Sequence, residues 1–69
     1  MITLDARGIS CPEPLIMLKK ALKKADKLIL LVDSNNALSN CETFAQKQGF
    51  TTKAEAKNGE YTVRISKNR

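Results

Sequence analysis

Five consecutive aliphatic residues, Leu28 to Val32, lie between Lys27 and Asp33 and constrain the fold of this chain more than any other feature. The run has the length of a β-strand and is far shorter than the roughly 20 apolar residues that cross a bilayer, so we expect no membrane insertion. A strand that is apolar on both faces is predicted to lie inside a sheet. Because 69 residues are too few for two hydrophobic cores, we expect a single domain over residues 1–69.

A helix is predicted on each side of this strand. From Pro12 to near Asp26, apolar residues recur every three or four positions, as on one face of an amphipathic helix. The second helix begins after Ser34 or Asn35, either of which suits an N-cap, and it ends at Gly49. The two apolar stripes consist of Leu15, Leu18, Leu22 and Ala25, and of Ala37, Leu38, Cys41, Phe44 and Ala45.

Alternating apolar and polar residues predict three further strands. A short one starts at Ile2 and leads into a loop over residues 6–10, where Gly8 permits a turn. The other two form a hairpin, because Asn58-Gly59 supplies the positive φ angles of a type I′ turn. After this turn Tyr61, Val63 and Ile65 share one face of the last strand.

The predicted order is βαβαββ, and the fold class is α+β, a two-layer α/β sandwich. Right-handed crossovers place both helices on one face of a four-stranded mixed sheet, with the strand order 1-2-4-3. The other sheet face stays open, so one side of the Leu28–Val32 strand is exposed: either the set of Leu28, Leu30 and Val32 or the pair of Ile29 and Leu31. Such a patch is either an association surface or is covered in part by long neighbouring side chains.

The net charge of +5 favours acidic partners, either a nucleic acid or an acidic face of a protein. Five lysines are concentrated around the end of the first helix, and they form either its solvated back or a docking surface. They are Lys19, Lys20, Lys23, Lys24 and Lys27, of which we predict that Lys19, Lys20 and Lys23 bind a partner.

Cys11 is the residue that most clearly points to chemistry. Proline is favoured at the first helical position, so Pro12 makes Cys11 the N-cap of the first helix. The helix-terminal amides there favour an anion and should enlarge the thiolate fraction. The alternative is that Cys11 only fills the end of the core. Besides Pro12, four neighbours are predicted to support the site. Arg7 adds positive charge or pairs with Asp5, and Gly8 turns the chain. Glu13 favours the helix dipole rather than acting in proton transfer, and Pro14 rigidifies the first turn.

Other chemistries lack the residues they need. The chain has no histidine, and two cysteines are too few for a closed zinc site, so neither a metal nor another cofactor is predicted. No glycine-rich phosphate loop is present. Cys41 lies within an apolar helix stripe and is predicted to be buried, and its 30-residue separation from Cys11 does not indicate a redox pair.

The sequence resembles the TusA/SirA/YedF family of sulfur carrier proteins. Residues 4–14, Leu-Asp-Ala-Arg-Gly-Ile-Ser-Cys-Pro-Glu-Pro, match the family signature Leu-Asp-x-Arg-Gly-x-x-Cys-Pro-x-Pro, and Lys19-Lys20-Ala21-Leu22 fits as well. Residues 32–34 and Gly49-Phe50 resemble the YedF-like branch more than TusA itself. The resemblance implies a βαβαββ sandwich and a sulfurtransferase activity in which Cys11 carries a persulfide. A protein donor such as a cysteine desulfurase supplies the sulfur, and a protein acceptor passes it to tRNA thiolation, thiosulfate or selenium metabolism.

Two other functions stay open beside the sulfur carrier: an RNA-binding module and a regulatory protein-interaction domain. Direct binding of nucleic acid is not favoured, because Phe44, Phe50 and Tyr61 are all on predicted core faces and leave no stacking platform.

Two cysteines are too few for a secreted disulfide scaffold, and the first residues do not resemble a signal peptide. We therefore expect a cytoplasmic protein.

Overall fold

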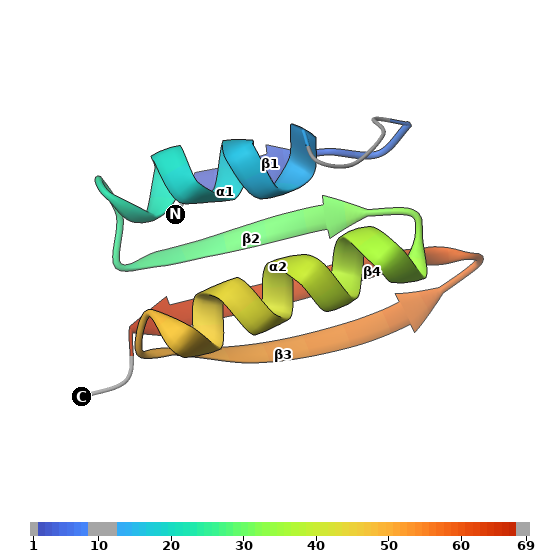
Figure 1. Ribbon diagram of the computed structural model, residues 1–69. Coiled ribbons are helices and arrows are strands. Elements are labelled where there is room, and N and C mark those ends of the chain that lie inside the picture. Colours follow the sequence, from blue (N-terminus) through green and yellow to red (C-terminus); the bar gives the residue numbers. More distant parts are fainter. Residues whose placement is uncertain (1, 9–12, 68–69) are drawn as a thin grey trace.

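A computed structural model describes residues 2–8 and 13–67 of the chain (Figure 1). The four strands and two helices follow one another in the predicted order βαβαββ. They are β1 (Ile2–Asp5), α1 (Glu13–Leu22), β2 (Lys27–Val32), α2 (Asn35–Lys47), β3 (Phe50–Lys57) and β4 (Glu60–Lys67).

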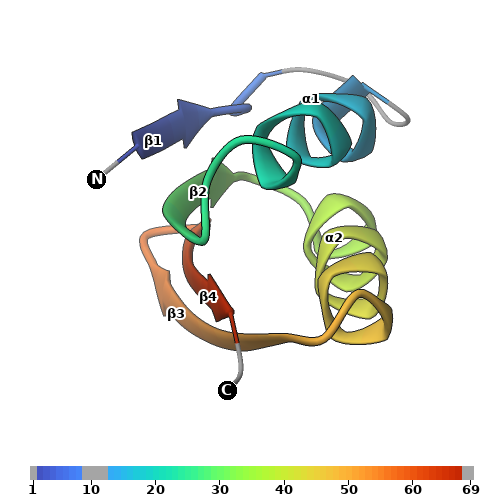
Figure 2. The same ribbon diagram turned by 90° about the vertical axis from the view of Figure 1, so that its left-hand side faces the viewer.

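The strands form one mixed sheet in the order β1-β2-β4-β3, as predicted. β1 and β2 are parallel, with Leu4 opposite Leu30, while β4 runs antiparallel to both β2 and β3. Both helices pack against the same face of this sheet, and the other face carries no helix (Figure 2). The arrangement follows from right-handed crossovers, which return each strand to the sheet with its helix on the same side.

The ends of α2 and the hairpin turn agree with the sequence prediction. Ser34 is the N-cap of α2, and its side-chain oxygen accepts a hydrogen bond from the backbone N–H of Ala37 at 3.2 Å. Gly49 follows the helix with a φ of 88°. Asn58 and Gly59 have φ angles of 52° and 78°, as a type I′ turn requires.

The first helix is shorter than predicted. It ends at Leu22 and not near Asp26, and the N–H groups of Lys24 and Ala25 both donate to the carbonyl of Ala21 in the turn that follows. The chain has to leave the helix here because β2 begins at Lys27 and the carbonyl of Asp26 already accepts a hydrogen bond from the N–H of Lys67. The buried face is also displaced: Pro14 and Leu18 are buried, whereas Leu15, Leu22 and Ala25 are only partly buried.

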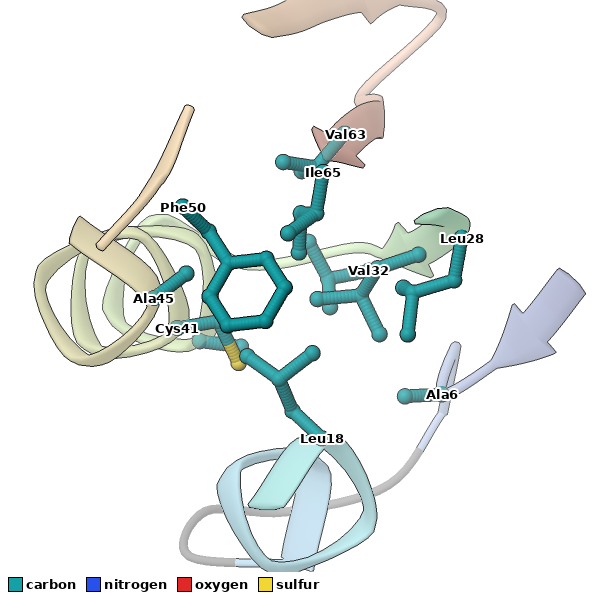
Figure 3. Packing of buried hydrophobic residues seen from close by; sticks show 11 residues of the cluster. Ala6, Leu18, Leu28, Val32, Cys41, Ala45, Phe50, Val63 and Ile65 are labelled. Atoms are coloured by element: carbon teal, nitrogen blue, oxygen red, sulfur yellow. The ribbon is translucent and has the colours of Figure 1, made fainter. Parts of the chain in front are cut away.

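The core lies between the helices and the covered face of the sheet (Figure 3). Alternate residues of β2, namely Leu28, Leu30 and Val32, are buried in it, and Ile29 and Leu31 lie on the open face, where they are partly exposed. This settles which side of β2 is uncovered. Within the described residues, neither helix is long and apolar enough to cross a membrane.

Candidate functional site

The loop after β1 and the beginning of α1 lie at the end of the sheet to which β1 and β2 point (Figure 1). Glu13 is the first residue of α1 and is exposed, whereas the ring of Pro14 is buried in the core. The packing of the Pro14 ring therefore holds the first turn of α1 against the core. Cys11 and Pro12, which the sequence places directly before this turn, lie outside the described residues.

Arg7 holds the loop by two ion pairs. Its guanidinium makes a two-pronged contact with Asp5, in which Nε donates to Oδ1 at 2.9 Å and Nη2 donates to Oδ2 at 2.8 Å. Its Nη1 also donates to Oε1 of Glu60, at the start of β4, at 3.2 Å. Of the two roles predicted for Arg7, the pairing with Asp5 is present, and Glu60 is a second partner.

These contacts change the ionisation of both partners. The hydrogen bonds from the Arg7 side chain lower the pKa of Asp5 from 3.8 to about 2. The hydrogen bond to Asp5, followed by that to Glu60, raises the pKa of Arg7 above its already high ordinary value. Asp5 therefore stays ionised across the physiological pH range, and two carboxylates surround the positive charge of Arg7.

Gly8 turns the chain next to this cluster. Its φ is 74°, in the left-handed region that favours glycine, which agrees with the predicted turn. Its backbone N–H donates to Oδ2 of Asp33 at 2.7 Å. Because Asp33 directly follows β2, this bond connects the loop after β1 to the end of the neighbouring parallel strand.

Reasoning from the sequence did not identify Asp33 or Glu60 as parts of this site. Asp33 could have been found, since the carboxyl ends of adjacent parallel strands meet at one edge of a sheet and Asp33 follows one of them. Glu60 could not have been found from the sequence, because its approach to Arg7 depends on how the hairpin twists beside β2. Both residues bind the loop that precedes Cys11 in the sequence.

The three lysines predicted to bind a partner are all exposed. Lys19 and Lys23 line a groove of about 370 Å³ between the helices, whose other lining residues include Leu22, Phe44 and Phe50. The ammonium of Lys19 lies 5.4 Å from the centre of the Phe44 ring, in a cation–π contact.

Cys41 is buried, as predicted, with none of its surface exposed. It lies in α2 and points into the core towards Leu18 of α1 (Figure 3). Over residues 2–8 and 13–67, no three Cys, Asp or Glu side chains are grouped closely enough to hold a metal ion.

Comparisons with known proteins agree on one family. The family described as "Sulfurtransferase TusA" matches residues 2–67. A protein of Methanocaldococcus jannaschii named "Putative sulfur carrier protein MJ0990" is 37% identical over 54 residues, which are 74% of this chain and 72% of that protein. The crystal structure of a SirA-like protein from Desulfitobacterium hafniense superposes with a TM-score of 0.91 at 34% identity, over the full length of both chains.

Proposed function

The chain belongs to the TusA family of sulfur carriers, and from this we propose that it accepts sulfane sulfur on Cys11 as a persulfide and passes it to a partner protein. The main support is the place of Cys11 in the chain. It lies two residues before Glu13, the first residue of α1. It also lies three residues after Gly8, whose backbone N–H donates a hydrogen bond to Asp33. The chain on both sides of the cysteine is thus held by the fold.

In the proposed transfer, the Cys11 thiolate attacks the outer sulfur of a persulfide on the donor protein. A bond forms between Cys11 Sγ and this sulfur while the S–S bond of the donor breaks, and the donor leaves as a thiolate. A thiolate on the acceptor then attacks the same outer sulfur, and Cys11 leaves as a thiolate in turn. No net oxidation takes place, so the transfer needs no cofactor.

The first-turn amides of α1 are the best source of anion stabilisation for this sulfur. Arg7 is less suited to that role, because Asp5 and Glu60 already bind its guanidinium. We infer that Arg7 and Gly8 act by holding the loop in place. Glu13 begins the helix and Pro14 anchors its first turn in the core.

The proposal predicts that Cys11 is loaded with sulfur. After incubation with a polysulfide donor, intact-mass spectrometry should show one added sulfur atom that a reductant removes, and Cys11→Ser should abolish it. If the helix amides favour the thiolate, alkylation of Cys11 should reach half of its maximal rate well below the pH of about 8.5 expected for an ordinary thiol.

The second cysteine provides the matched control. Cys41→Ala should load normally, since Cys41 is buried in the core. A Cys11→Ser protein that still gains a labile sulfur, or a wild-type protein that gains none from any donor, would contradict the proposal.

We further propose that Lys19 and Lys20 of α1, with Lys23 directly after it, help the donor to dock. The triple change of Lys19, Lys20 and Lys23 to Glu should slow loading from a persulfidated cysteine desulfurase by about tenfold, because repulsion replaces attraction at the encounter. Loading from a small polysulfide should not change. Equal loss with both donors would show that the lysines act on the cysteine or on the fold and not on docking.

RNA binding is the weaker alternative. The three aromatic residues lie on the helix side of the molecule, where Phe50 is buried and Phe44 and Tyr61 pack against the core. Salt-dependent RNA binding that Cys11→Ser leaves unchanged would favour this alternative. Three predictions stay untested: the pathway served, the similarity to the YedF-like branch and the cytoplasmic location. The genes beside this one would test the pathway.

A further inference from the structure

The sheet face that carries no helix has a small apolar centre. Ile29 and Leu31 of β2 alternate with the buried residues, so they point to this side, and they are partly exposed. Their neighbours across the sheet are polar: Thr3 and Asp5 on β1, and Arg64 and Thr62 on β4. Partly exposed aliphatic side chains on an interior strand of an uncovered sheet face are suited to bury against a second surface.

Positive charges lie along one border of this apolar centre. Arg64 is directly opposite Ile29, Lys53 is opposite Arg64 on the next strand, and Lys27 is at the start of β2. All three are exposed, and the ion pairs found among the described residues involve only Asp5, Arg7 and Glu60. The three cations thus outnumber the one acidic neighbour, Glu55, and none of them forms an ion pair within the described part of the chain.

The surface is hollowed on both sides of Arg64. One hollow, of about 280 Å³, is lined by Lys27, Ile29 and Arg64 among others. The other, of about 400 Å³, is lined by Lys53, Arg64 and the acidic Glu55. Arg64 lines both hollows, and their other lining residues come from β2, β3 and β4.

We propose that this open face docks an amphipathic helix of a partner protein, with aliphatic residues at its centre and acidic residues along one border. The spacing fits: two residues along β2 separate Ile29 and Leu31 by about 6.7 Å, and one helical step from i to i+4 rises about 6 Å. Arg64 and Lys53 lie one and two strands away, at about 5 and 10 Å, which is within the width of a helix. The acidic border then meets the basic one.

Two other occupants fit less well. A single-stranded nucleic acid would match the charge, but no aromatic side chain of the described residues lies on this face to stack on its bases. A second copy of the chain would bring one set of cations against another. The inference rests on the proposed function only in assuming a protein partner, and it assigns that partner a surface different from the α1 lysines.

The test uses the full-length protein labelled with ¹⁵N and a designed helical peptide that has a Leu stripe bordered on one side by Glu. The amide resonances of β2 and β4 should shift on titration. Arg64→Glu combined with Lys53→Glu should weaken binding by about fivefold or more, since two attractive pairs become repulsive. The matched control, Lys24→Glu combined with Lys47→Glu, makes the same charge change on the helix side and should bind normally.

The outcomes separate this inference from the proposed function. A peptide with Gln in place of Glu that binds equally well, or shifts confined to the helices, would overturn the acidic-helix proposal. So would tighter binding of oligouridine, or self-association on this face seen by sedimentation. Because threonine is β-branched and favours strands, Ile29→Thr combined with Leu31→Thr should remain folded, load sulfur on Cys11 and lose the peptide. Cys11→Ser should lose sulfur and keep the peptide.

Discussion

Arg7 is the residue around which the loop before Cys11 is organised. It pairs with Asp5 two residues earlier and with Glu60 from the far end of the chain. The first of these pairings was one of two alternatives that the sequence offered. The second required the tertiary structure, as did the hydrogen bond from Gly8 to Asp33.

The low pKa of Asp5 gives this pair a defined pH dependence. Because the pKa is about 2 in the folded state and 3.8 ordinarily, the pair stabilises the fold fully above about pH 4, and this contribution is lost as the pH falls towards 2. Asp5→Asn should therefore be less stable than wild type in urea at pH 6, and the difference should shrink between pH 5 and pH 2. A constant difference for Asp5→Asn would contradict the assignment.

At the scale of elements, local signals fixed the ends of α2 but not the end of α1. Ser34 and Gly49 act through the chain immediately beside them, so their types alone predict where the helix begins and ends. The stripe of α1 continues to Ala25, yet the helix ends at Leu22. Its end is set by the position of β2 in the sheet, which no local pattern records.

The Ser34 cap predicts a measurable loss of stability. Ser34→Ala removes the acceptor of the Ala37 N–H and should lower the free energy of unfolding by about 1 kcal/mol. Urea denaturation followed by circular dichroism measures this change. Ser39, exposed within the same helix, is the control, because Ser39→Ala should be neutral or slightly stabilising. Equal effects of the two changes would show that the cap contributes nothing.

At the scale of the molecule, one small core connects the sheet to both helices. Leu18 of α1 is fully buried in it, together with Leu30 of β2, Cys41 of α2 and Val63 of β4. Domains of this size bury only about 60% of the surface that the unfolded chain exposes, so a single core side chain carries a large share of the stability. The beginning of α1, where Pro14 is buried, is held in place through this core.

Leu18→Ala should therefore destabilise the whole domain. We expect a loss of about 3 kcal/mol in the free energy of unfolding, from lost burial and the cavity left behind. Ile16→Ala in the same helix removes a side chain that is 38% exposed and should cost about 0.5 kcal/mol. Thermal or urea unfolding distinguishes the two, and similar losses would mean that Leu18 is not part of a close-packed core.

The sequence alone determined the element order, the strand order, the turn at Asn58-Gly59 and the burial of Cys41, because each depends on local periodicity, on backbone preference or on the handedness of crossovers. It also pointed to Cys11 as the residue to test. Only the tertiary structure decided that Ile29 and Leu31 lie on the open face and that Asp33 and Glu60 reach the loop before Cys11. The physical reason is that these features depend on residues far apart in the sequence, up to 53 positions for Arg7 and Glu60. The distances between such residues depend on how the sheet twists and how the helices pack.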